Sequence, residues 1–424
     1  MTPEIKQRID AIRQGEVPEG YVRGKLGVAP SEWDEVHFST LFIENSIYTD
    51  DLEKYPLYSL TIEDGITAKT ERYERSHLVK KENSYKVVRP NDYAYNPMNI
   101  RFGAVARHTG DISVAVSGYY DIFTTVHPSD LAFMDSFLTS DAMITYYNKV
   151  STGSLLEKQR VHFSQFIGFR LSLPPLDERA KIAAILTTQD KVIELKEKRI
   201  AQKQRQKKYL MQQLLTGKKR LKGFSGEWES LSLGQIARKV TQKNISFEFS
   251  LVLSNSAQNG IVPQSDQFDK DIANVDKIDG YYVVENGSFV YNPRISVTAP
   301  CGPINVNCTG KTGVMSPLYT VFQIKDDRVD NDFLKYYFKS TCWFRYMKGV
   351  SNYGVRHDRM SVSDNEFFVM PIPIPEFLEQ KRIAKIFSTA DSEISLLQQE
   401  LEQEKLKKKA LMQLLLTGIV RVSA

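Results

Sequence analysis

Residues 174–190 read PPLDERAKIAAILTTQD, and residues 375–391 read PEFLEQKRIAKIFSTAD. These stretches open two segments, 173–221 and 374–422, that align without a gap at an offset of 201, with 20 of 49 positions identical. The segments also finish alike, as LMQQLLTG and LMQLLLTG. A duplication of this length, with other sequence between its copies, indicates a protein built from two similar halves. Such a protein suits a target that is itself bipartite.

Each duplicated segment predicts one long helix. Proline is tolerated just before or at a helix start, and glycine favours the residue just past its end. Both signals occur in both segments, as Pro174, Pro175 and Gly217 in the first and as Pro371, Pro373, Pro375 and Gly418 in the second. From Glu178 to Leu215 the first helix would span about 57 Å at 1.5 Å per residue.

The two predicted helices share one heptad. Its apolar positions are Leu186, Ile193, Ile200 and Leu214 in the first helix and Phe387, Ile394, Leu401 and Leu415 in the second. A lysine, Lys207 or Lys408, interrupts each series at the same place. A shared apolar seam favours two helices packed against each other as a coiled coil, for helix pairing and partner docking. The alternative is that each helix packs on its own globular domain.

A fainter repeat lies outside the helices. Glu32-Trp33 matches Glu227-Trp228 at an offset of 195, and Tyr95-Asn96-Pro97 matches Tyr291-Asn292-Pro293 at 196. Farther along, residues 133–140 resemble residues 333–340 at an offset of 200. Such a drift is expected when loops vary in length while the frame persists. Short runs rich in Tyr, Phe and Val predict strands with some helix. The predicted fold is α+β, with two globular domains related by a pseudo-two-fold axis and separated by two long antiparallel helices. The predicted boundaries are 1–172, 173–217, 218–371 and 372–424.

Composition limits the class of protein. Of the 424 residues, 42% are hydrophobic and 11% aromatic, enough for packed cores. Three cysteines are too few for a disulfide framework, and no apolar run approaches a membrane span. These features predict a cytoplasmic protein without a metal site. The net charge is +5, and the run from Lys196 to Lys222 holds eleven basic residues against one acid. That run is either a solvated helix face or a stripe that faces phosphates.

Catalytic signatures are incomplete throughout. The Asn-Pro turns at 96–97 and 292–293 lack the second proline and the aromatic residue of amino-methyltransferases. Gly310-Lys311-Thr312 resembles a P-loop tail, but the required earlier glycine is Asn305. The six histidines show no helix-face metal spacing. We therefore predict a binding protein without catalysis of its own.

Basic and polar loop residues are the candidate DNA-binding groups. Arginine can bind guanine through two hydrogen bonds, asparagine can bind adenine, and lysine can hold phosphate. In the first domain the candidates are Arg101, Arg107, His108, Lys149 and Arg160, and in the second they are Arg294, Lys311, Lys348, Asn352, Arg356 and Arg359.

Taken together, the chain resembles the specificity subunits of Type I restriction–modification enzymes. The resemblance covers essentially the whole chain. Its carriers are Pro-x-x-x-Glu-x-x-x-Ile-Ala at 174–183 and 375–384, Leu-Met-Gln-x-Leu-Leu-Thr-Gly at 210–217 and 411–418, and the paired Trp and Tyr-Asn-Pro positions.

The resemblance implies a non-catalytic subunit with two target-recognition domains, each reading one half of an interrupted site in double-stranded DNA. The helices would set the gap and dock two methyltransferase subunits, and a restriction and motor subunit could join. S-adenosylmethionine, ATP and Mg²⁺ would bind to those partners and not to this chain. The residues alone leave a coiled-coil scaffold for proteins as the alternative.

Overall fold

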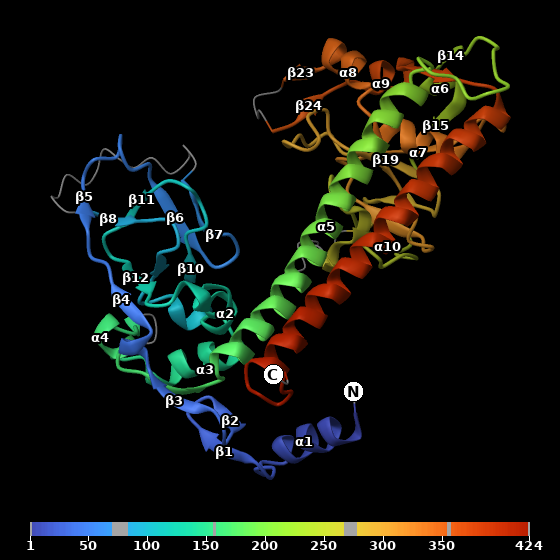
Figure 1. Ribbon diagram of the computed structural model, residues 1–424. Helices are drawn as coiled ribbons and strands as arrows, with labels where there is room; N and C mark the ends of the chain where they lie inside the picture. The colour runs from blue at the N-terminus through green and yellow to red at the C-terminus, as the bar shows by residue number, and fades with distance from the viewer. Residues whose placement is uncertain (1, 70–83, 156–157, 267–277, 354–357, 423–424) are drawn as a thin grey trace. The chain divides into compact units, whose positions relative to one another are not determined.

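The computed structural model describes residues 2–69, 84–155, 158–266, 278–353 and 358–422 (Figure 1). Within them the chain forms two compact units. Unit 1 contains residues 1–197 and 399–424, and unit 2 contains residues 198–398. Each unit therefore holds one α+β domain together with parts of both long helices, which confirms the predicted fold class. No helix in the described ranges is both long and apolar enough to cross a membrane.

The domain of unit 1 is built from small antiparallel sheets. A four-stranded sheet has the order β10 (Val105–Arg107), β9 (Tyr93–Tyr95), β12 (Asp121–Thr125) and β4 (Phe42–Glu44). A three-stranded sheet has the order β11 (Val114–Ser117), β8 (Tyr85–Val88) and β5 (Tyr48–Thr49). The two-stranded pairs are β1 (Tyr21–Gly24) with β2 (Gly27–Pro30), β3 (Asp34–His37) with β13 (Arg170–Leu173), and β6 (Tyr58–Thr61) with β7 (Gly65–Ala68). The helices outside the duplicated segment are α1 (Pro3–Arg13), α2 (Leu131–Phe137), α3 (Asp141–Val150) and α4 (Phe163–Phe166).

Unit 2 likewise has one four-stranded antiparallel sheet together with two-stranded pairs. Its four-stranded sheet has the order β15 (Ala237–Lys239), β22 (Thr320–Ile324), β19 (Phe289–Tyr291) and β20 (Ile304–Val306). The pairs are β14 (Glu229–Ser232) with β25 (Pro371–Ile374), β16 (Leu253–Ser256) with β17 (Gly260–Pro263), β18 (Tyr282–Val284) with β21 (Gly313–Met315), and β23 (Asn352–Tyr353) with β24 (Met360–Ser361). Its short helices are α6 (Leu233–Ile236), α7 (Asn331–Lys339), α8 (Phe344–Val350) and α9 (Asp364–Val369).

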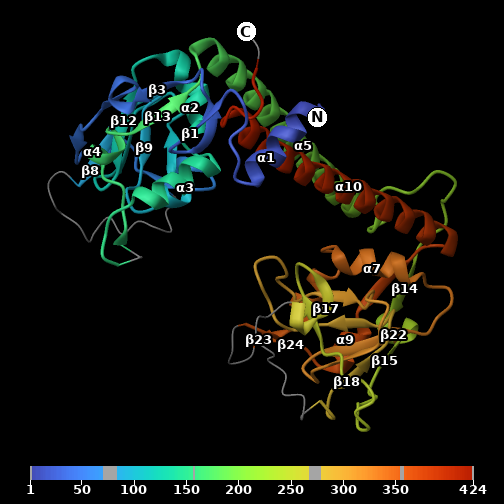
Figure 2. The same ribbon diagram turned by 90° about the horizontal axis from the view of Figure 1, so that it is seen from below.

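The long helices are α5 (Leu176–Leu214) and α10 (Phe377–Leu415), which lie side by side in Figures 1 and 2. Each begins just after the predicted prolines. Each ends shortly before its glycine, which adopts the left-handed conformation, with φ of +67° at Gly217 and +69° at Gly418. That conformation is accessible to glycine without the clash that a Cβ would cause, which explains the shared stop.

The two helices run antiparallel, as ion pairs between them show. In unit 1, Lys196 contacts Glu400 at 2.7 Å and Lys408 contacts Asp190. In unit 2, Lys203 contacts Glu393 at 2.6 Å. Residue numbers fall along α10 as they rise along α5, so the helices run in opposite directions.

The residues of the predicted seam lie mostly inside the protein, and some of them also pack against the domains. Of the eight seam residues, all are buried except Ile193, which is partly buried. In unit 1, Leu186 and Leu415 share one core with the domain's strands and helices. In unit 2, Leu214 and Phe387 do the same. The helices thus pack on each other and on the domains.

The lysines that interrupt the seam are paired rather than solvated. Lys207 contacts Asp391, and Lys408 contacts Asp190. Both lysine–aspartate pairs join positions of the duplicated segment, so one interaction occurs in both units. The basic run is therefore not a uniform face, because Lys196, Lys203 and Lys207 each bind an acid of α10.

A buried carboxylate near the start of each long helix ties three elements together. In unit 2, Glu379 is fully buried and accepts hydrogen bonds from Arg220, Nε to Oε1 at 2.9 Å and Nη2 to Oε2 at 2.7 Å. The Nε1 of Trp228 donates to Oε2 at 3.2 Å. Arg220 follows the end of α5, and Trp228 precedes β14. We call this set, with its equivalent in unit 1, a glutamate clamp.

The glutamate clamp of unit 1 has the same geometry. Arg421 donates from Nε to Oε1 of Glu178 at 2.9 Å and from Nη2 to Oε2 at 3.0 Å. The Nε1 of Trp33 donates to Oε2 at 3.2 Å. Sequence reasoning used the glutamates and tryptophans but missed Arg220 and Arg421, although they are identical at the 201-residue offset. A charged pair of this kind stabilises a fold only when the carboxylate is fully hydrogen-bonded, as it is in both units.

The two terminal glycines give a matched test of packing. A Cβ at Gly418 would lie 2.5 Å from Pro30 Cδ and 2.8 Å from Trp33 Cζ2, whereas a Cβ at Gly217 would lie no closer than 3.5 Å to Trp228. Gly217→Ala should cost about 1 kcal/mol of unfolding free energy for the left-handed backbone alone. Gly418→Ala should cost about 1–3 kcal/mol more, because Pro30 must move. Urea unfolding of both variants checks this, and equal losses would contradict it.

Glu379→Gln should lower the unfolding free energy by about 3 kcal/mol, because Arg220 loses its counter-charge in a buried setting. Burial raises the pKa of Glu379, but the hydrogen bonds from Arg220 and Trp228 outweigh burial and hold the pKa below its usual 4.5. The stabilisation is therefore complete above that value and is lost as pH falls through the lower folded pKa.

The difference between the wild-type protein and Glu379→Gln should accordingly shrink when the pH is lowered below about 4.5. Glu393→Gln is the control, since the Glu393 side chain is 40% exposed beside Lys203. It should cost under about 1 kcal/mol. A difference for Glu379→Gln that stays constant with pH would refute the ionised clamp.

Candidate nucleic-acid interface

The Asn-Pro turns begin equivalent loops in the two units. The backbone N–H of Asn96 donates to the carbonyl of Ala104 at 3.1 Å, and that of Asn292 donates to the carbonyl of Pro303 at 2.9 Å. These bonds close the loops in the same way. The first joins residues 8 apart (104 − 96) and the second joins residues 11 apart (303 − 292), so the loop of unit 2 is three residues longer.

A second segment lies against each turn. The N–H of Val161 donates to the carbonyl of Pro97 at 3.0 Å, and the N–H of Met360 donates to that of Pro293 at 2.9 Å. Arg160 directly precedes Val161 and Arg359 directly precedes Met360, so the two arginines lie beside their turns in equivalent places. Arg160 and Arg359 are both half-buried.

Three of the predicted DNA-binding residues of unit 1 have partners inside the fold. The guanidinium of Arg107 binds Asp135, with Nε to Oδ1 at 2.9 Å and Nη2 to Oδ2 at 2.7 Å, and this contact raises the pKa of Arg107. His108 is buried, with Nε2 2.7 Å from the carbonyl of Ile112. These two side chains support the loop from within.

Arg101 is likewise buried, and its Nη1 donates to Gln159 Oε1. That bond fastens the loop after the turn to the segment that carries Arg160. Sequence could not separate these three internally paired groups from exposed ones, because the pairing partners Asp135 and Gln159 are 28 and 58 residues away.

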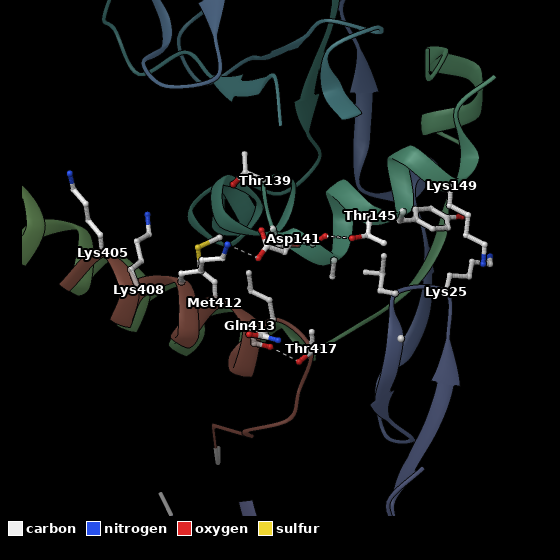
Figure 3. Close-up of a pocket in the computed structure, with 17 residues that line it drawn as sticks. Lys25, Thr139, Asp141, Thr145, Lys149, Lys405, Lys408, Met412, Gln413 and Thr417 are labelled. Atoms are coloured by element: carbon white, nitrogen blue, oxygen red, sulfur yellow. Dashed lines mark hydrogen bonds and ion pairs between the residues drawn. The ribbon is translucent and has the colours of Figure 1, made fainter. Parts of the chain in front are cut away.

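Lys149 is exposed and lines a cavity of about 650 Å³ beside the end of α10. In Figure 3, Lys405, Lys408 and Met412 project from α10, with Lys149 and Lys25 across the cavity. Several of its ammonium groups already contact acids: Lys408 contacts Asp190, Lys409 contacts Asp141 at 3.3 Å, and Lys405 contacts Glu197 at 3.4 Å. The pairing reduces the positive charge that the cavity offers to an anion.

The basic candidates of unit 2 are more accessible. Arg294, Lys311 and Lys348 are exposed. Arg294 pairs through its backbone with Arg359 and lies 3.9 Å from the carboxylate of Asp358, with 69% of the Arg294 side chain exposed. Asn352 is placed in β23, and Arg356 lies outside the described residues.

The described residues of the site therefore offer exposed hydrogen-bond donors. Exposed Arg and Lys groups can bind phosphates and base edges. No group of three or more potential metal ligands was found among the described residues.

Comparison with known proteins agrees with this arrangement. Residues 225–405 match the family model for the Type I restriction modification DNA specificity domain. The putative type I restriction enzyme MjaX specificity subunit of Methanocaldococcus jannaschii is 27% identical over 299 residues, which are 63% of this chain and 63% of that protein. The MjaVIII specificity subunit of the same organism is 26% identical over 280 residues, 61% of this chain and 63% of that one. The matches thus span less than two thirds of these relatives.

A solved structure extends the likeness of fold over most of the chain. It is described as "Structural basis underlying complex assembly and conformational transition of the type I R-M system" and aligns with a TM-score of 0.56 at 14% identity, covering 92% of this chain and 99% of its own. Part of the chain is similar in sequence to Type I restriction–modification specificity subunits, and most of it is similar in fold to a solved structure.

Proposed function

We propose that this chain is the DNA-recognition subunit of a Type I restriction–modification complex, and that each α+β domain reads one half of an interrupted site. The observation that carries the proposal is the repeated frame with unlike loops. Equivalent backbone hydrogen bonds close the loops after Asn96 and Asn292, but those loops differ in length and in the position of their one arginine, Arg101 or Arg294. Two such readers suit two different half-sites.

The paired helices would fix the gap between those half-sites. Their antiparallel ion pairs and buried seam give a stiff element, and stiffness is what a distance-setting device needs. We further propose that the helices dock two methyltransferase subunits, and that a restriction and motor subunit can join. S-adenosylmethionine, ATP and Mg²⁺ would bind to those partner subunits, and the complex would work in the cytoplasm. This chain would contribute recognition without catalysis.

Exchange of one domain tests the function directly. Residues 218–374 replaced by those of another specificity subunit should change one half-site of the methylated motif and leave the other intact. The exchange is carried to residue 374 so that β25 stays with its partner β14. The readout is genome-wide mapping of methylated bases in cells that also express the methyltransferase subunit. A change in both half-sites, or none, would refute independent reading, and a scaffold for proteins alone would give no change.

Helix length should set the gap. Insertion of four residues after Lys198 and after the equivalent Gln399 adds about 6 Å to each helix. Since base pairs rise by about 3.4 Å, the tolerated gap should lengthen by one or two base pairs with both half-sites preserved. Insertion in one helix alone is the control, because it shifts the seam out of register and should lower stability. Altered half-sites with an unchanged gap would rule out this role.

A further inference from the structure

The clearest difference between the two reading domains lies in the loop after the Asn-Pro turn. In unit 1 this loop is closed over its neighbour by the buried contact between Arg101 and Gln159. In unit 2 the loop is three residues longer, and the position that corresponds to Met98 holds Arg294. The flanking strands are the same in both units, whereas this loop differs in length and in the position of its arginine, so specificity is expected to lie in the loop.

The side chain of Arg294 is available for a ligand. It is 69% exposed, and its nearest acid, Asp358, lies 3.9 Å away, beyond hydrogen-bond distance. A surface pair of this kind contributes little energy and is readily exchanged. Arg107 in unit 1 shows the opposite state, with a two-pronged contact to Asp135.

The backbone holds the cation and the acid in fixed places. Arg294 pairs with Arg359, and the N–H of Ile295 donates to the carbonyl of Asp358 at 2.9 Å. The N–H of Met360 donates to the carbonyl of Pro293. Two segments far apart in sequence, joined by backbone hydrogen bonds, therefore present an arginine and an aspartate side by side, and base readout requires groups that are positioned in advance.

The same loop also exposes an apolar group. Val297, in the same loop, is 102% exposed, more than any other large hydrophobic side chain in the part of the chain that is described. When a partner covers this valine, apolar surface is removed from water, and this burial favours binding. The thymine methyl group in the major groove is an apolar partner of that size.

We propose that Arg294 and Asp358 read one G·C base pair in the half-site of unit 2, a reading that rests on the proposed DNA-recognition function. The guanidinium would donate to guanine O6 and N7, and the carboxylate would accept from the amino group of the paired cytosine. In unit 1, Met98 stands in the place of Arg294, so that domain does not read its half-site in this way. The two half-sites of the DNA target would then differ because this one loop differs between the domains.

The test begins with Arg294→Gln, assembled with the methyltransferase subunit and mapped by genome-wide methylation. The guanine requirement at one position of one half-site should be lost, with the other half-site unchanged. Methylation at the wild-type site should fall about ten- to hundred-fold, the loss expected for a two-hydrogen-bond base contact. Arg328→Gln is the charge-matched control, since the Arg328 side chain is 62% exposed, contacts Asp326 and is not among the candidate DNA-binding residues.

A second measurement uses modified DNA with the wild-type complex. Replacement of the identified guanine by 7-deazaguanine removes the N7 acceptor and should weaken binding. The same replacement should have little further effect on the Arg294→Gln complex, because the contact is already gone. Equal weakening in both complexes would overturn the proposal. Because Arg294 is exposed, its variant should unfold at the wild-type temperature.

The outcomes separate this inference from the function beneath it. If the wild-type chain directs no bipartite methylation, the proposed function fails. If it does, but Arg294→Gln leaves the motif unchanged or lowers methylation at all sites uniformly, only the reading of G·C fails. A unit 2 half-site without a G·C pair also overturns it.

Discussion

The fold of each unit depends on keeping a buried carboxylate charged. Glu178 and Glu379 lie near the starts of the long helices, where a carboxylate without a partner would be strongly destabilising. The required cation comes from the chain just after the end of the other long helix, as Arg421 or Arg220. Hydrogen bonds to the carboxylate therefore connect the start of one long helix, the segment after the end of the other, and the segment that enters the domain.

The lysine–aspartate pairs add register to this assembly. Lys207 and Lys408 occupy seam positions that an apolar residue would fill at lower cost, and each finds its aspartate only in one alignment of the helices. A slip by one heptad would leave a lysine within the seam without its counter-charge. A polar seam residue of this kind specifies alignment at some expense of stability. Since both partners belong to the duplicated segment, one device serves both units.

The sequence was most informative where structure follows from local signals and repetition. Prolines, terminal glycines and the heptad placed the first long helix at Glu178–Leu215, close to the observed Leu176–Leu214 of α5, and the drifting offset indicated a repeated frame of strands. The separation of exposed from internally paired cations was not predictable. Arg107 and Arg294 look alike in sequence, and only the approach of Asp135 to one of them, through packing of α2, tells them apart. The arginines of the glutamate clamps were visible in the duplication but lacked a structural reason until their partners were placed.

The backbone hydrogen bonds that close the loops after Asn96 and Asn292 join the two ends of each loop at equivalent places. Between them the chain can gain three residues for a loop-closure cost of only about 0.3 kcal/mol, since that cost grows with the logarithm of length. The strands on either side keep their register whatever the insertion contains. Small insertions can therefore accumulate in this one loop without a change in the core, so the loop is open to rapid evolutionary change while the rest of the domain stays the same.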